Sequence, residues 1–220
     1  MKSDAQVQQD VINELRWDTH VSATDVGVEV DQGVVTLTGT VDSFAKKMAA
    51  QEAAHRVVGV LDVANDIQVR VPGSAGRTDT DVALAVRRTL EWDALVPDER
   101  IQTTVMSGWV TLDGQVNAWA HRQEAERVVR GLAGVVGVVN NLRVHAADIE
   151  PWRVRDAIEE ALARRAEREA ERIQVSVQDG TVTITGRVRS WAERRAVVGA
   201  AGHAPGVQHI DDQLVIDPYA

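Results

Sequence analysis

Hydrophobic and polar positions recur in the same order three times along the chain. Each repeat opens with apolar residues at i, i+4 and i+8, which predicts an amphipathic helix with one inward stripe. These stripes are Val7, Val11 and Leu15; Val82, Val86 and Leu90; and Val154, Ile158 and Leu162. Two alternating runs joined by a glycine turn follow, at 26–30 with 34–38, 101–105 with 109–113, and 173–177 with 181–185. Such paired runs predict a β-hairpin.

A second helix and a last short strand complete each repeat. The second helix is expected to begin at Ser43, Asn117 or Ser190, and the last strands at 67–69, 142–144 and 214–216. A polar residue that suits a turn precedes each last strand, at Asn65, Asn140 and Asp212. The predicted fold class is α+β, with three tandem α-β-β-α-β units, each a three-stranded sheet covered on one face by two helices.

Three glycines per repeat keep the same spacing, with intervals of 6 and 20 residues. Glycine tolerates backbone shapes that other residues avoid, so fixed glycines indicate shared turns. They are Gly33, Gly39 and Gly59; Gly108, Gly114 and Gly134; and Gly180, Gly186 and Gly206. The register predicts domains at 1–71, 79–146 and 150–218, with linkers at 71–78 and 145–151.

Composition limits what the protein can do. The 220 residues leave roughly 70 per unit, near the lower edge for an independent core, so the units are expected to lean on one another. Net charge −9 argues against general nucleic-acid binding, and the lack of cysteine excludes disulfides and thiolate chemistry. No stretch approaches the ~20 apolar residues of a membrane span, and the N-terminus has no signal-peptide pattern. A cytoplasmic protein is expected.

The sequence contains no recognisable catalytic motif. The six histidines are scattered without metal-ligand spacing, and no aligned position carries one in all three repeats. The glycine turns join strand to strand and lack the ending of a phosphate loop. We therefore predict a non-enzymatic protein with no cofactor and no metal.

Tryptophan supplies six of the eight aromatic residues. Trp17 and Trp92 align at the end of the first helix, and a second aligned column at the start of the second helix holds Phe44, Trp119 and Trp191. Repeated columns favour rings that seal helix ends against the sheet; the alternative is exposed interface anchors. Trp109 is expected on the uncovered sheet face, as a contact between repeats or, alternatively, a site for a partner.

Basic residues gather beside two of these tryptophans. Arg87 and Arg88 accompany Trp92, whereas Arg164, Arg165 and Arg168 lie in the same repeat as Trp191. The neighbouring acids favour ordinary i,i+4 ion pairs on solvated helices. The functional alternative is binding to anionic phospholipid head groups, with Trp109 as a further lipid- or partner-binding candidate.

The repeated motifs resemble the BON domain family in its OsmY-like form. Each repeat contains Val-x-[Leu/Ile]-x-Gly, and later Gly-Val-x-x-[Val/Ile]-x-[Asn/Asp]-x-[Leu/Ile], as in Gly59 to Ile67. The resemblance implies a non-enzymatic bacterial module array in a stress-related role such as osmotic stress, binding anionic phospholipid or envelope-associated surfaces. Without a leader or lipidation cysteine, the expected place is the cytoplasm or the inner face of the membrane. The alternative is a cytoplasmic protein–protein interaction scaffold without lipid binding, and the oligomeric state stays open.

Overall fold

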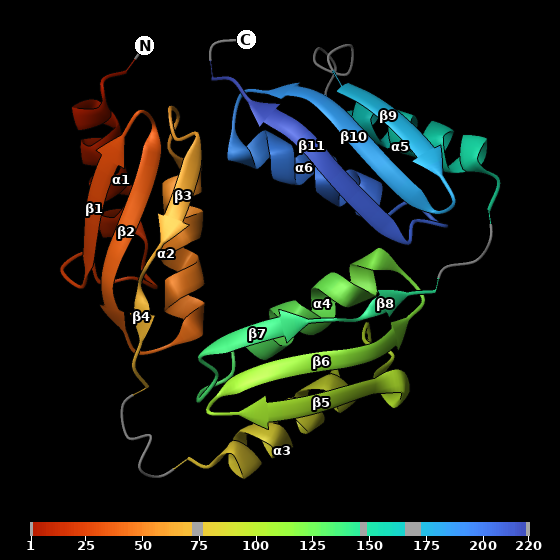
Figure 1. Ribbon diagram of the computed structural model, residues 1–220, viewed down its shortest axis with the longest axis horizontal. Coiled ribbons are helices and arrows are strands. Elements are labelled where there is room, and N and C mark those ends of the chain that lie inside the picture. Colours follow the sequence, from red (N-terminus) through yellow and green to blue (C-terminus); the bar gives the residue numbers. More distant parts are fainter. Residues whose placement is uncertain (1, 72–76, 146–148, 166–172, 219–220) are drawn as a thin grey trace.

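Three α+β units follow one another along the chain in the computed structural model, which describes residues 2–71, 77–145, 149–165 and 173–218 (Figure 1). Residues 72–76 and 146–148 of the two predicted linkers fall outside these ranges. The helices are α1 Asp4–Trp17, α2 Phe44–Arg56, α3 Asp79–Trp92, α4 Trp119–Arg130, α5 Pro151–Arg165 and α6 Trp191–Gly202. The strands are β1 Val26–Asp31, β2 Val34–Val41, β3 Asp62–Asn65, β4 Gln68–Val69, β5 Ile101–Met106, β6 Trp109–Val116, β7 Gly137–Asn140, β8 Arg143–Val144, β9 Ile173–Gln178, β10 Thr181–Val188 and β11 His209–Ile216; a 3-10 turn, Asp98–Arg100, precedes β5.

Each sheet is built around the return strand of the hairpin. In the first unit β2 pairs antiparallel with β1 and parallel with β3, and the other units repeat this order. The hairpin turn takes positive φ at two consecutive residues, 50° at Gln32 and 79° at Gly33. A turn of this kind matches the right-handed twist of the flanking strands. The predicted hairpins and their structural glycines are therefore in place.

The strand glycines of the first and second units permit a close backbone approach. A Cβ at Gly39 would lie 2.0 Å from the carbonyl oxygen of Asp25, and one at Gly114 would lie 2.1 Å from that of Arg100. Both glycines also have φ near 130°, at 127° and 129°. No side chain fits there, which explains why this glycine recurs.

The last strand starts earlier than the sequence pattern predicted. Residues Asp62–Asn65 already pair with β2 before the turn at Asn65, and pairing resumes at Gln68–Val69. At the break the Asn65 side-chain oxygen accepts a hydrogen bond from the Ile67 N–H at 3.3 Å. In the third unit the strand runs on without interruption as β11.

Among α1, α2, α3, α4 and α6, four helix starts carry a side-chain cap. Ser3 and Thr78 form capping boxes, and Ser43 and Ser190 cap α2 and α6 through their side chains. The second helix of the middle unit is capped at Ala118 without a side-chain bond, so the prediction of a start at Asn117 was wrong by one residue. The predicted inward stripes of the first helices are buried in all three units.

A carboxylate at the start of the first helix fastens the hairpin turn in two units. Asp4 accepts hydrogen bonds from the N–H groups of Gln32 and Gly33, at 2.9 and 3.1 Å. Asp79 binds the N–H groups of Ser107 and Gly108 in the same way, at 2.7 and 2.9 Å. Pro151 begins the first helix of the third unit, and a proline offers no such acceptor.

The three units form a closed arrangement with the second helices at its centre. Figure 1 shows α2, α4 and α6 facing the middle, with the strands of each unit in front of its helices. The end of each unit meets the hairpin turn of another across a cleft: Val69 and Arg70 face Gly108, Val144 faces Asp179, and Ile216 faces Gly33. The third of these clefts joins the two ends of the chain.

One aromatic residue of each unit packs against the hydrophobic core of another unit. Phe44 packs against the core of the second unit, Trp119 against that of the third, and Trp191 against that of the first. This column was predicted to pack, and it does, but across units and not against its own sheet. The small units therefore lean on one another, as their size predicted.

Candidate binding surfaces

The first helix of the second unit carries hydrophobic side chains on its solvent face. Leu84 and Trp92 are 52% and 88% exposed, and Leu95, in the following turn, is 64% exposed. Leu84, Arg88 and Trp92 are spaced i, i+4 and i+8, so they form one line along α3. We call Leu84, Arg88, Trp92 and Leu95 the α3 stripe. Exposed apolar groups arranged together indicate an interaction surface more strongly than scattered ones do.

Local structure supports both ends of the α3 stripe. Val82, Val86 and Leu90 anchor the opposite side of α3 in the core, which leaves the stripe facing outward. Beyond the helix, the Leu95 N–H donates to the Asp93 side chain at 2.9 Å, and this small turn presents Leu95. Such a turn is a usual role of aspartate after a helix.

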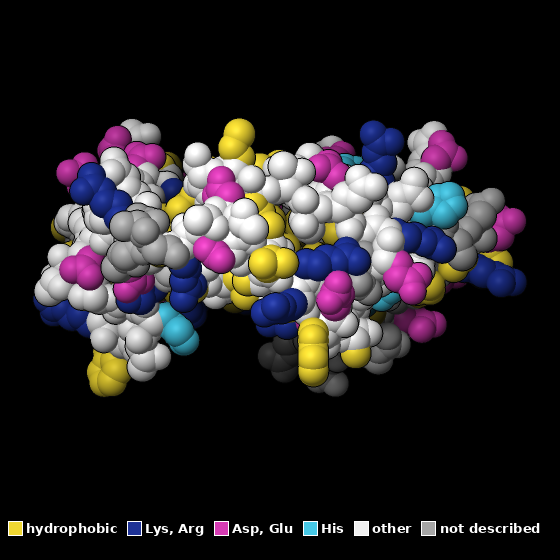
Figure 2. Space-filling view, turned by 90° about the horizontal axis from the view of Figure 1, so that it is seen from below, with side chains coloured by type: hydrophobic (Ala, Val, Ile, Leu, Met, Phe, Trp, Pro, Cys, Tyr) yellow, Lys and Arg dark blue, Asp and Glu magenta, His cyan; other side chains and the backbone are white. Residues whose placement is uncertain are grey.

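The charges around the α3 stripe are partly neutralised. Arg87 pairs with Glu91, Nε to Oε1 at 2.8 Å, in the i,i+4 geometry predicted for solvated helices. Arg88 is exposed, and no ion pair of it is found among the described residues. Seen from the α3 side, Figure 2 shows hydrophobic side chains projecting among Lys and Arg side chains. The surface thus combines apolar groups with an available positive charge.

The first unit has the same tryptophan in a different setting. Trp17 is 84% exposed, but the stripe positions before it hold Gln9 and Asn13, which bond to each other at 3.1 Å. The expectation that Trp17 and Trp92 seal the helix ends against the sheet was wrong. Both rings point into solvent because the preceding Leu15 and Leu90 already fill those core positions.

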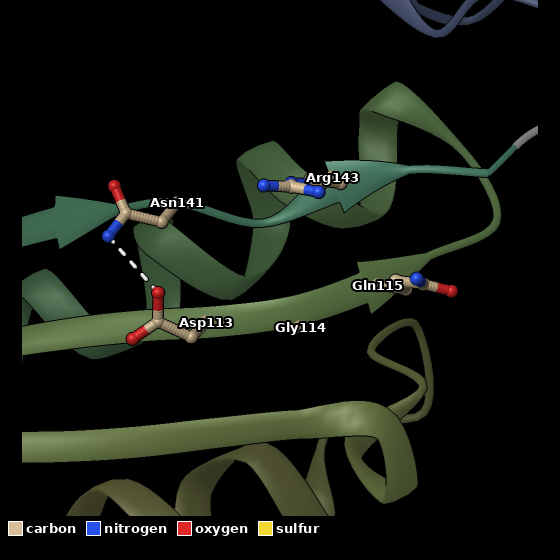
Figure 3. A pocket seen from close by; sticks show the side chains of 5 residues that line it. All are labelled: Asp113, Gly114, Gln115, Asn141 and Arg143. Atoms are coloured by element: carbon tan, nitrogen blue, oxygen red, sulfur yellow. Dashed lines mark hydrogen bonds between the residues drawn. The ribbon is translucent and has the colours of Figure 1, made fainter.

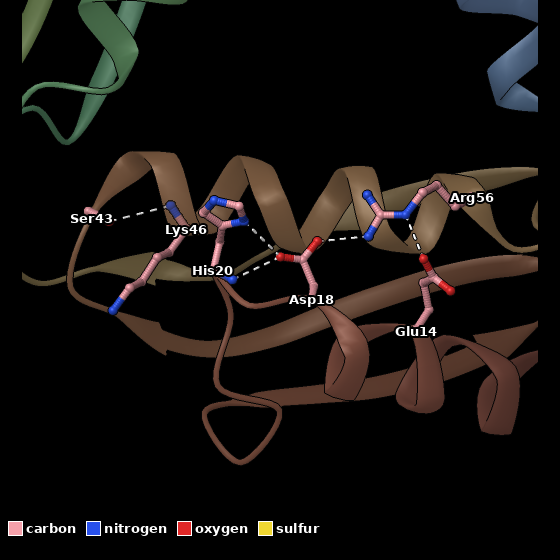
Figure 4. Close-up of polar contacts among 6 residues, drawn as sticks. All are labelled: Glu14, Asp18, His20, Ser43, Lys46 and Arg56. Atoms are coloured by element: carbon pink, nitrogen blue, oxygen red, sulfur yellow. Dashed lines mark hydrogen bonds and ion pairs between the residues drawn. The ribbon is translucent and has the colours of Figure 1, made fainter.

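An ionic cluster next to Trp17 fixes the end of α1 (Figure 4). Arg56 of α2 donates to Glu14 at 2.6 Å and to Asp18 at 2.7 Å. Burial opposes ionisation of Asp18, but hydrogen bonds from Arg56 and His20 outweigh it and hold the pKa of Asp18 below its usual value. The cluster connects α1 to α2 and therefore has a structural role.

The arginines of the other predicted basic surface lie outside the described side chains, and its tryptophan is packed between units. Trp191 is only partly exposed and packs against the first unit, with its Nε1 atom buried. Arg164 and Arg165 end α5, but their side chains lie outside the described part of the structure, as does Arg168 entirely. The aligned stripe positions in α5 are Asp156 and Glu160, which are acidic.

A second exposed patch occupies the uncovered sheet face of the middle unit. Trp109 is 51% exposed and lies over Gly137 of the neighbouring strand, where a Cβ would come within 2.4 Å of the ring. Met106 pairs with Trp109 across the hairpin, and Val139 lies on the same face; they are 73% and 41% exposed. Trp109 was expected to form a contact between repeats, and the contact that is found for its ring lies within its own sheet, at Gly137.

The same sheet face holds a polar hollow where β7 breaks from β8 (Figure 3). Asp113, Gly114, Gln115, Asn141 and Arg143 line it. The Asn141 amide donates a hydrogen bond to Asp113 at 3.1 Å, so the carboxylate that lines the hollow already has a partner within the protein. Within the described ranges, no group of three or more His, Asp or Glu side chains could hold a metal ion. The described helices likewise include none long and apolar enough to cross a membrane.

This fold and its repeated glycine and asparagine turns define a tandem array of small α+β modules. The BON domain model matches residues 3–71, 78–146 and 153–218, and the chain belongs to that family. It is similar to "Osmotically-inducible protein Y" of Escherichia coli, 34% identical over 56% of this chain and 64% of that protein, and thus spans less than two thirds of its length. It is also similar to "21 kDa hemolysin" of Actinobacillus pleuropneumoniae, 28% identical over 63% of this chain and 75% of that one.

Solved structures give a much weaker likeness. A chain described as CdsD, a structural protein of the type III secretion system of Chlamydia trachomatis, is 15% identical, with 95% of this chain and 91% of that chain covered. The TM-score is 0.28, which is too low to support an argument about function.

Proposed function

We propose that this protein is a non-enzymatic binding module array whose α3 stripe attaches to anionic phospholipid surfaces. The observation that carries the proposal is the exposed line of Leu84, Arg88 and Trp92 on the solvent side of α3, with exposed Leu95 in the turn that follows. Tryptophan and leucine suit the boundary between head groups and acyl chains, and arginine suits the phosphates. A basic side chain near an anionic surface adds about 1 kcal/mol.

We also propose a role in osmotic stress, which the names of two relatives support. The name "Osmotically-inducible protein Y" supports a role in osmotic stress, and the hemolysin name is compatible with a protein that meets membranes. The predicted location, the cytoplasm or the inner face of the membrane, remains a prediction. Salt-sensitive, reversible attachment is expected, because one helix face with a single exposed arginine, Arg88, gives modest affinity.

A protein–protein scaffold is the second candidate function. An exposed apolar patch favours this function. The patch consists of Met106, Trp109 and Val139 and lies on the sheet face that the helices do not cover. The two functions make different predictions: a scaffold requires concentration-dependent association and no attachment to vesicles.

Co-sedimentation tests the lipid proposal with a matched control in the same chain. Wild type should pellet with phosphatidylglycerol vesicles but not with phosphatidylcholine vesicles, and less at high salt. Trp92→Ala should weaken attachment roughly tenfold, given the loss of a large apolar side chain. Trp17→Ala removes an equally exposed tryptophan from a polar setting and should change attachment less than twofold. Equal effects of the two substitutions, or no pelleting of wild type, would contradict the proposal.

A further inference from the structure

The closed arrangement of the units depends on one contact that the chain connectivity does not enforce. Phe44 and Trp119 each bridge units that follow one another in the sequence, whereas Trp191 bridges the third unit to the first. We call this last contact, between α2 and α6, the seam. Interfaces of the same head-to-tail type close a ring only if the final one forms. The seam therefore decides whether the three units form a ring or an open string.

A histidine lies at the centre of the seam. His55 stacks on Trp191 with ring centroids 3.9 Å apart and planes 13° from parallel. Its aligned counterpart in the third unit is Gly202, which receives Trp119 so closely that a Cβ there would lie 2.4 Å from the ring. In the first and third units this position therefore receives the aromatic residue of another unit, and His55 provides a flat ring of its own.

The surroundings of His55 favour the neutral imidazole. The residue is 7% exposed, and within the described residues neither ring nitrogen has a hydrogen-bond partner. Burial, followed by the positive charge of Arg195, lowers the pKa of His55 to about 4, while Asp62 opposes this and Arg194 adds to it. Stacking on Trp191 favours the charged form of His55. However, a cation–π contact shifts the protonation equilibrium by only roughly tenfold, which is less than the opposing effect of burial.

The other charges at the seam are compensated. Arg194 of α6 donates to Asp212 at 2.8 Å. On the α4 side, Arg130 pairs with Glu52 of α2 at 3.3 Å. Arg56, next to His55 on α2, is held by Glu14 and Asp18. Of the two arginines on α6 that lower the pKa of His55, Arg195 has the larger effect.

We propose that protonation of His55 opens the seam and converts the ring into an open string of three folded units. The open form exposes His55 with its ordinary pKa of 6.5, so it binds a proton before the closed form does. Closure is therefore strongest above pH 6.5 and weakens as the pH falls toward about 4. From these two values the closure equilibrium should shift by about 300-fold in total, between pH values well above 6.5 and values well below 4.

The absence of native cysteine allows a direct distance measurement. Spin labels at Val58→Cys in the first unit and Val215→Cys in the third occupy sites that are 51% and 59% exposed. Electron–electron double resonance should give one short, narrow distance distribution at pH 7.5 and a longer, broader one at pH 4. A label pair inside the second unit, at Leu84→Cys and Val139→Cys, should keep its distance at both pH values.

Two variants link any opening to His55. His55→Phe retains a flat ring that cannot be protonated, so its distances should not change with pH. Arg195→Ala leaves the stack untouched and should reduce the opening at pH 4, because the pKa of His55 rises toward its ordinary value. If wild type keeps the short distance at pH 4, or if both variants open as wild type does, the proposal is overturned.

Discussion

His55 of the first unit lies flat against Trp191 of the third unit, with 3.9 Å between ring centroids. The contact is one of three that use the same aromatic position of the repeat, and it joins units that are not neighbours in the chain. Tandem modules usually contact only the next module along the sequence. Here the last unit returns to the first, so each of the three cores gains a ring from another unit.

Removal of the aromatic residue at the seam should separate the first and third units. Trp191→Ala is expected to increase the radius of gyration in solution scattering at neutral pH, since no linker holds the first and third units together. Trp109→Ala, which removes a half-exposed tryptophan from the open sheet face, should leave the radius unchanged. An unchanged radius in Trp191→Ala would show that the seam does not depend on this ring.

The carboxylates that fasten the hairpin turns should stabilise their own units. Asp4→Ala and Asp79→Ala each remove two charge-assisted hydrogen bonds, and each should cost about 1–2 kcal/mol in the free energy of unfolding. Hydrogen exchange provides the matched comparison: Asp4→Ala should speed exchange at Gln32 and Gly33 but not at Ser107 and Gly108. Equal exchange rates at both turns would contradict the role of Asp4.

Two glycine-to-alanine substitutions should act in opposite directions. Gly114→Ala places a Cβ 2.1 Å from a backbone oxygen at a φ of 129°, so it should destabilise the second unit by about 3 kcal/mol or more. Gly199 lies inside α6 with no atom within 4 Å of its added Cβ. Gly199→Ala should therefore stabilise the protein by up to about 1 kcal/mol. Urea unfolding measures both, and destabilisation by Gly199→Ala would show a contact that the structure does not contain.

The Arg56 cluster should contribute a pH-dependent part of the stability. Because the folded-state pKa of Asp18 lies below its ordinary 3.8, its contribution is fully present above that value and is lost as the pH falls through the lower folded-state pKa. Asp18→Asn should therefore reduce the free energy of unfolding at pH 7, by about 1 kcal/mol. The difference from wild type should shrink in stronger acid. A constant difference at all pH values would argue for a role of Asp18 other than ion pairing.

The repeated elements could be predicted from the sequence because each depends on local chemistry. The inward stripe of α3 and the turn at Gly108 depend on helical spacing and positive φ, which the residue types reveal directly. The strand Asp62–Asn65 was missed because it is only four residues long and half exposed. Its pairing comes from the neighbouring strand and not from its own pattern.

The surfaces were harder to predict, for two different reasons. The destination of Trp191 lies in another unit, and no periodicity within one repeat encodes a contact between repeats. The exposure of Trp92, in contrast, had a signal: Leu84 and Arg88 align with Gln9 and Asn13 of the first unit. A comparison of the outward positions across repeats would have shown that only the second unit carries an apolar stripe.

The most direct test of the proposed function places a reporter at the end of the α3 stripe. An environment-sensitive fluorophore on Leu95→Cys should shift to shorter wavelength when phosphatidylglycerol vesicles are added, and the same fluorophore on His20→Cys, the aligned position of the first unit, should not. That result would locate the attachment at the second unit. No shift at position 95, or equal shifts at both positions, would contradict lipid binding through the α3 stripe.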